Sequence, residues 1–122
     1  MNKFIRGFGY AFKGVSYAVK TQLNFRVHLV CAFIVISLGY VLHISAAEWL
    51  WVIIAIGLVL AAEAFNTALE LLVDFVSPEY DKKAGHIKDM CAAAVLLTAV
   101  TALVIGLVIF LPKVIVLFHH AA

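Results

Sequence analysis

Three long apolar runs, separated by short polar joints, make up most of the chain. Residues 27–47 contain no charged side chain and only two histidines, His28 and His43. Residues 49–75 carry a few polar groups, and residues 88–111 are apolar after their first two positions. A helix crosses the bilayer core with about 20 apolar residues, so each run predicts a transmembrane helix. The short joint between the first two predicts that they are antiparallel neighbours.

Residues 1–24 show a different pattern, which predicts an amphipathic helix on the membrane surface. At 100° per residue, Arg6, Lys13 and Lys20 lie within about 40° of one another. Phenylalanine and small apolar residues gather on the opposite side. A basic face opposite an apolar one suits a helix lying in the membrane interface. The alternative is a targeting presequence. This interpretation is less favourable because the segment continues directly into the first predicted span.

Composition excludes most other classes of protein. The 122 residues allow one domain (1–122), with 66% hydrophobic and 13% charged residues and a mean hydropathy of +1.10. A soluble domain this small needs more polar surface, and a disordered chain needs far fewer apolar residues. The net charge of +2 gives no reason to expect a nucleic-acid partner. Cys31 and Cys91 lie in apolar runs and are interpreted as small core residues. We therefore predict an all-α, multi-pass integral membrane protein.

The positions of the basic residues predict the orientation of the spans. Of the nine lysines and arginines, all but Lys113 lie in the N-terminal segment or in the joint between the second and third spans. Basic residues accumulate on the cytoplasmic side of a membrane protein. Three spans with a cytoplasmic N-terminus place both regions there.

Polar residues form a stripe on the second span. They fall on one narrow face of a helix and are Glu63, Asn66, Thr67, Glu70 and Asp74. Ionisable groups are costly in lipid, so the stripe must face protein or water. Counting from the outer interface, we place Glu63 roughly 9 Å inside the cytoplasmic boundary and Glu70 near it.

Three interpretations of the stripe remain open from the residues alone. Hydrogen bonds between helices explain Asn66 and Thr67, but carboxylates are an expensive way to hold helices together. An ion or proton pathway is the second possibility, although the outer half of this span has no ionisable group. The third is an active site for a membrane-embedded substrate and a soluble, charged one. Clustered carboxylates hold Mg²⁺, Lys88 can meet a phosphate, and a poorly solvated Glu63 can act as a general base.

Motifs along the chain resemble those of the prokaryotic diacylglycerol kinase family, which includes undecaprenol kinases. The chain has no Walker-type phosphate loop. Three motifs carry the resemblance. In chain order they are Asn24-Phe25-Arg26-Val27-His28, then Glu63-Ala-Phe-Asn66-Thr67-Ala-Leu-Glu70 with Asp74, and then Lys88-Asp89-Met90. The resemblance covers nearly the whole chain. It implies a surface helix and three transmembrane helices per subunit, a homotrimer with shared active sites, and a location in the bacterial inner membrane.

The resemblance also implies roles for individual residues in ATP- and Mg²⁺-dependent phosphorylation of a membrane lipid. Glu63 matches the base that takes a proton from the lipid hydroxyl, and Arg26 and Asn66 match polar groups around the lipid. Glu70 matches a ligand of the Mg²⁺ on ATP. The positions that match the nucleotide site are Tyr10, Gln22, Glu70, Glu79, Asp81, Lys88 and Asp89.

One position departs from the family pattern. Gln22 stands where the family commonly has a second metal-binding glutamate. An amide oxygen carries no charge, so Mg²⁺ affinity is expected to be weaker. Since the other motif positions are present, a working kinase is still expected. The string from Asn24 to His28 looks more like the undecaprenol-kinase branch, and diacylglycerol is the alternative substrate.

Overall fold

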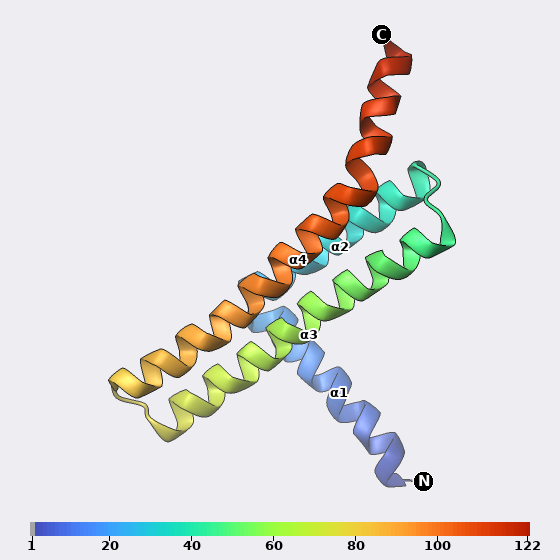
Figure 1. Ribbon diagram of the computed structural model, residues 1–122. Coiled ribbons are helices and arrows are strands. Elements are labelled where there is room, and N and C mark those ends of the chain that lie inside the picture. Colours follow the sequence, from blue (N-terminus) through green and yellow to red (C-terminus); the bar gives the residue numbers. More distant parts are fainter. Residues whose placement is uncertain (1) are drawn as a thin grey trace.

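The structure is a computed structural model that describes residues 2–122. Every regular element of these residues is a helix, as the sequence predicts (Figure 1). In chain order the helices are α1 (Asn2–Thr21), α2 (Leu23–Val41), α3 (Ala46–Val76) and α4 (Lys82–Ala121). The last three are long and apolar enough to cross a membrane. The all-α fold with three candidate spans is thus confirmed.

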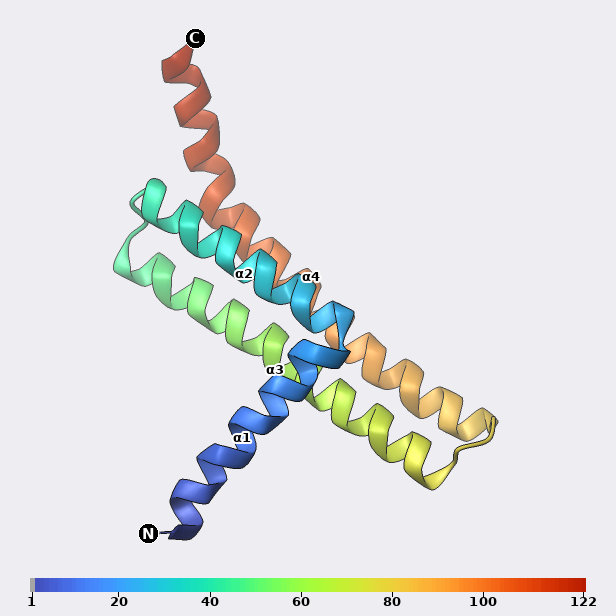
Figure 2. The ribbon, with the colours of Figure 1, turned by 180° about the vertical axis from the view of Figure 1, so that it is seen from behind.

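Helix α3 lies at the centre of the arrangement. It runs antiparallel to α4 along most of its length and also contacts α2 and α1. Helix α1 leaves the bundle at a steep angle, near the middle of α3 (Figure 2). The N-terminal part of α1 therefore extends away from the three long helices.

The predicted helix boundaries differ from the observed ones. The expected surface helix 1–24 ends at Thr21, because Gln22 adopts an extended conformation with φ −112° and ψ 110°. The expected span 27–47 ends at Val41. The helices expected over 49–75 and 88–111 are longer, at Ala46–Val76 and Lys82–Ala121. At 1.5 Å per residue α4 is about 60 Å long, twice the roughly 30 Å apolar core, so its ends project beyond that core.

Helix α4 continues through a proline instead of ending before it. Pro112 lies inside the helix, and the ribbon bends there, so that the C-terminal part turns away from α3 (Figure 1). A proline in a helix interior removes one hydrogen bond and kinks the helix. Lys113 Nζ lies 3.1 Å from Glu48 Oε2, which joins the segment after the kink to the start of α3.

The turn between α2 and α3 is fixed by a capping box and by close packing. Ser45 accepts from the backbone N–H of Glu48, whose carboxylate accepts in return from the Ser45 N–H. Gly39 is buried against the indole of Trp49. A Cβ on Gly39 would lie 2.6 Å from the Trp49 ring. The glycine is therefore required by the close approach of the two helices.

We expect Gly39→Ala to destabilise the protein by about 1–3 kcal/mol, the usual cost of overpacking. Gly57→Ala is the matched control, since a Cβ there meets nothing within 4 Å and alanine favours the helix. Thermal unfolding in detergent should show a lower midpoint for Gly39→Ala and an unchanged or higher one for Gly57→Ala. Equal midpoints for the two variants would contradict this packing.

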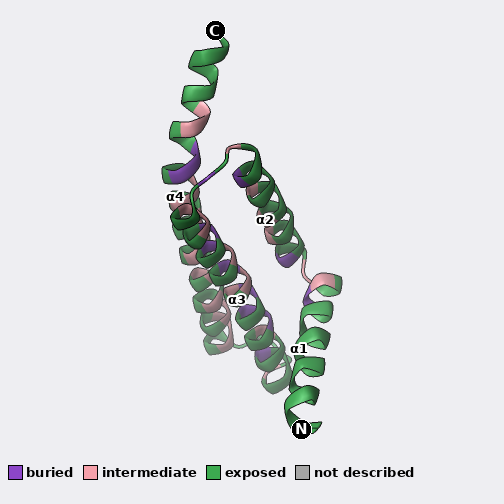
Figure 3. Cartoon of the chain, turned by 90° about the vertical axis from the view of Figure 1, so that its right-hand side faces the viewer, coloured by how far each residue is buried: buried purple, intermediate pink, exposed green. Residues whose placement is uncertain are grey.

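Buried residues follow one face of α3, while most of α1, apart from Ala18 near its end, and the outer faces of the long helices are exposed (Figure 3). Towards the 42–45 turn this buried face is apolar and includes Val52, Ala55 and Val59. Further along the same face it becomes polar, with Glu63, Asn66 and Thr67. These three residues of the polar stripe are thus turned towards protein, as their cost in lipid requires, whereas Glu70 is half-buried and Asp74 is exposed.

Candidate active site

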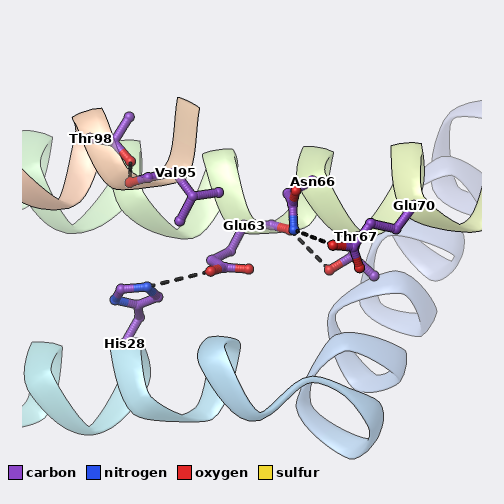
Figure 4. A network of polar contacts seen from close by, with 7 residues as sticks. All are labelled: His28, Glu63, Asn66, Thr67, Glu70, Val95 and Thr98. Carbon is purple, nitrogen blue, oxygen red and sulfur yellow. Dashed lines mark hydrogen bonds and ion pairs between the residues drawn. The ribbon is translucent and has the colours of Figure 1, made fainter. Parts of the chain in front are cut away.

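Glu63 is the most deeply buried ionisable group that the structure describes. It lies on α3 with 2% of its surface exposed, and its side chain points towards α2 (Figure 4). There His28 Nε2 approaches Glu63 Oε1 to 3.5 Å. Within residues 2–122, Oε1 has no hydrogen-bond donor. A buried carboxylate oxygen without a donor is uncommon and remains available to a substrate hydroxyl.

The polar stripe continues from Glu63 along α3 through contacts one helical turn apart. Thr67 Oγ1 donates to the backbone carbonyl of Glu63 at 3.0 Å. Asn66 Nδ2 donates to Glu70 Oε1 at 3.3 Å, and the buried Oδ1 of Asn66 has no partner among the described residues. Asn66 therefore contacts Glu70 and keeps one acceptor free, while Thr67 contacts the backbone of Glu63.

A cation from α4 closes the far end of the stripe. Lys88 forms an ion pair with Asp74 and also interacts electrostatically with Glu70. Both partners of the Lys88–Asp74 pair are partly exposed. Solvated charges of both signs suit a soluble, charged ligand better than a lipid tail. The two ends of the stripe thus differ in polarity: Glu63 is buried, and Lys88 is accessible.

An apolar cavity of about 550 Å³ lies between α2, α3 and α4. His28 and Ala99 are at the end nearer Glu63, and Leu38 and Phe110 lie near the 42–45 turn. His28 is the one ionisable residue among the lining residues, apart from the thiol of Cys31. The cavity therefore reaches His28, the side chain that contacts the buried carboxylate of Glu63.

Arg26 and Gln22, both expected in the site, form hydrogen bonds with residues at the end of α1. The Arg26 guanidinium donates to the carbonyls of Val19 and Lys20 at 2.8 and 3.2 Å. A cation at these last carbonyls stabilises the C-terminus of α1. Gln22 Nε2 donates to Thr21 Oγ1 at 3.2 Å. Both side chains lie at the junction of α1 and α2.

The remaining nucleotide-site candidates are more dispersed. Tyr10 is on α1 with 67% of its surface exposed, and the Lys13 ammonium lies 5.7 Å from its ring centroid. Glu79 is in the loop between α3 and α4, and Asp89 is exposed on α4. Asp81 is the N-cap of α4, where its carboxylate accepts from the backbone N–H groups of Lys83 and Ala84. Among residues 2–122, none of these side chains forms a hydrogen bond or ion pair with Lys88, whose partner is Asp74.

The carboxylates also do not form a closed metal centre. Residues 2–122 contain no group of three or more histidine, cysteine, aspartate or glutamate side chains that could hold a metal ion. Mg²⁺ at phosphate-transfer sites usually takes one or two carboxylates together with water and substrate phosphates. Glu70, with Lys88 nearby, fits that smaller requirement.

Comparison with known proteins agrees with this arrangement. Residues 9–110 match the sequence profile of the family described as prokaryotic diacylglycerol kinase. The chain belongs to this family. It is therefore an enzyme, a lipid kinase, and ATP is the phosphate donor that a kinase implies. The resemblance inferred from the motifs is confirmed.

Three relatives cover most of the chain. It is 35% identical to the undecaprenol kinase of Bacillus subtilis over 93% of this chain and 92% of that protein. It is 42% identical to a diacylglycerol kinase of Synechocystis over 86% of this chain, but only 61% of that longer protein. Identity to the diacylglycerol kinase of Escherichia coli is 30%, over 84% of each chain.

Sequence reasoning assigned no role to His28, although the structure places it against Glu63 in this kinase. A signal was present, because a histidine at the start of a charge-free apolar run is unusual. Its partner could not be identified, since the pairing depends on how α2 and α3 align along their lengths.

Proposed function

We propose that this protein transfers the γ-phosphoryl group of ATP to the hydroxyl of a membrane lipid, with undecaprenol as the preferred acceptor. In this mechanism Glu63 takes the proton from the lipid hydroxyl. The freed oxygen forms a bond to the γ-phosphorus, while the bond from that phosphorus to the β–γ bridging oxygen of ATP breaks. The products are a lipid monophosphate and ADP.

One observation carries this proposal, namely that Glu63, the buried end of the polar stripe, contacts His28, which lines the apolar cavity. A lipid chain lying in the cavity would bring its headgroup to His28 and Glu63. The stripe then leads from Glu63 through Asn66 and Glu70 to Lys88. A lipid hydroxyl and a nucleotide phosphate can thus approach Glu63 from opposite ends.

The polar end suits the nucleotide with its metal ion. Glu70 would hold Mg²⁺ on the phosphates of ATP, and Gln22 is a weaker second candidate because its amide carries no charge. The ion would neutralise charge on the transferring phosphoryl group. Lys88 would contact a phosphate, for which it would exchange its present partner, Asp74. Tyr10, Glu79, Asp81 and Asp89 remain candidates for contacts with the nucleotide.

The lipid is inferred from two observations. The kinase from Bacillus subtilis that matches nearly the full length of the chain is an undecaprenol kinase. The cavity offers apolar walls along α2, α3 and α4 and few polar groups, which suits the hydrocarbon chain of a membrane lipid. Arg26 and Asn66 remain candidates for contacts near the lipid hydroxyl.

The proposed assembly rests on the positions of the nucleotide-site candidates, and the proposed orientation rests on the positions of the basic residues. One chain leaves the nucleotide-site candidates dispersed, so a homotrimer with sites shared between subunits would complete them. The basic residues of α1 and of the joint between α3 and α4 favour a cytoplasmic location for the N-terminus. The apolar face of α1 would then lie in the inner leaflet of the bacterial cytoplasmic membrane. With this orientation the polar end of the site would face the cytoplasm, where ATP is available.

The substrate is tested by competition in one bilayer. Purified protein is reconstituted with equal amounts of undecaprenol and diacylglycerol, supplied with labelled ATP and Mg²⁺, and the labelled lipids are separated. We expect more label in undecaprenyl phosphate than in phosphatidic acid. A preference for diacylglycerol would overturn the proposed acceptor, and label in neither lipid would overturn the proposed activity.

A further inference from the structure

The reaction produces one proton that must leave a buried site. Phosphoryl transfer to an alcohol breaks the lipid O–H bond, and in the proposed mechanism Glu63 receives that proton. With only 2% of its surface exposed, Glu63 cannot pass the proton directly to bulk water. A protonated Glu63 is no longer a base, so each turnover requires a route by which the proton leaves.

Most neighbours of Glu63 cannot accept a proton. On α3, the Thr67 hydroxyl donates to the Glu63 carbonyl, and the Asn66 amide donates to Glu70. On α4, the hydroxyl of Thr98 donates to the carbonyl of Val95 (Figure 4). Hydroxyl and amide groups are very weak bases. The groups that face Glu63 from its own helix and from α4 are therefore unsuitable.

Helix α2 supplies the one basic neighbour. His28 is the only ion-pair partner of Glu63 in the part of the chain that the structure describes, with Nε2 at 3.5 Å from Oε1. The cation on the same helix, Arg26, is held by carbonyls at the end of α1. Lys88 on α4 is paired with Asp74. His28 thus contacts Glu63 without competition from another basic side chain.

The side chain of His28 is also more accessible in the single chain than that of Glu63. Its side chain is 22% exposed, compared with 2% for Glu63. Imidazole changes charge between about pH 5 and 8, so it can take up and release a proton within one turnover. Apart from His28 and the thiol of Cys31, the residues that line the apolar cavity have no ionisable side chain, so they offer no other carrier for the proton.

We propose that His28 removes the proton from Glu63 after each phosphoryl transfer. Nε2 accepts the proton from the Glu63 carboxyl group, and the resulting imidazolium releases it to water. Glu63 returns to the carboxylate form, ready for the next lipid. The inference rests on the proposed function, in which Glu63 is the base, and it makes His28 a positioning residue that acts through Glu63.

The test uses two substitutions and added imidazole. His28→Ala is expected to lower kcat at least tenfold, since proton transfer by a placed side chain contributes about 10²–10⁴-fold, and to leave KM for ATP unchanged. Free imidazole should restore part of the rate, in proportion to its neutral form. His28→Gln keeps an N–H donor near Nε2 but cannot accept a proton. It should be similarly slow, and the pH profile of its kcat should differ from that of the wild type.

The control is His43→Asn, at the other end of α2. His43 adopts a left-handed conformation with φ 50°, which asparagine tolerates. This variant should keep the wild-type rate and should not respond to imidazole. A His28→Gln protein with wild-type kcat and pH profile would overturn the proposal, as would a slow, folded His28→Ala protein that imidazole does not accelerate. A wild-type protein that phosphorylates no lipid would contradict the proposed function itself.

Discussion

Glu63→Gln is expected to reduce phosphoryl transfer at least 100-fold, within the range of about 10²–10⁴ that general-base catalysis contributes. Glutamine has nearly the same size and shape, so the buried position stays filled, but its amide cannot accept the hydroxyl proton. The measurement is the steady-state rate of lipid phosphorylation at saturating ATP. Folding should be preserved, because the substitution removes a buried charge and leaves no cavity.

Glu48→Gln is the matched control for this prediction. Glu48 lies at the other end of α3, where it takes part in the capping box and pairs with Lys113. Glutamine can still complete a capping box, so activity should remain near that of the wild type. Native mass spectrometry should find both variants as trimers. A Glu63→Gln trimer with activity within a few-fold of the wild type would remove Glu63 from the base role.

Glu70→Ala is expected to raise the Mg²⁺ concentration needed for half-maximal activity about tenfold or more, and Gln22→Glu is expected to lower it. A tenfold change corresponds to about 1.4 kcal/mol of binding free energy. The physical reason is the number of anionic oxygens around one hard cation. The measurement is a Mg²⁺ titration of the initial rate at fixed ATP.

Each variant in this pair tests a different ligand. Glu70→Gln serves as a control that keeps an acceptor oxygen and the hydrogen bond from Asn66, and its Mg²⁺ requirement should lie between those of the wild type and Glu70→Ala. An unchanged titration for Gln22→Glu would show that position 22 is not a ligand. Unchanged titrations for both Glu70 variants would exclude Glu70.

The elements of the fold were predictable because they depend on local sequence. Charge-free runs longer than the bilayer core indicate membrane helices, and the spacing from Glu63 to Asp74 places five polar groups on one helix face. Both predictions need only the helical period. The burial of Glu63, Asn66 and Thr67 then follows from the cost of exposing such groups to lipid.

The helix ends and the contacts between helices were less predictable. The last span was predicted over 88–111, whereas α4 runs from Lys82 to Ala121 through Pro112, because a single proline can kink a long apolar helix without terminating it. Asp81 is the N-cap of α4, a role that an aspartate directly before a helix can indicate and that was not assigned from the sequence; its contact with the nucleotide stays a prediction. The contact of His28 with Glu63 depends on the relative alignment of α2 and α3, which local sequence does not determine.

The central claim, that the buried carboxylate and the polar stripe form a lipid kinase site and not an ion pathway, is tested by one measurement on sealed vesicles. Purified wild-type protein is reconstituted with undecaprenol and a proton gradient, then given γ-labelled ATP and Mg²⁺, while lipid label and the gradient are followed together. We expect label in extracted undecaprenyl phosphate, and we expect chelation of Mg²⁺ to abolish that label. The proton gradient should persist as it does in protein-free vesicles. Vesicles that lose the gradient while the extracted lipid stays unlabelled would contradict the central claim.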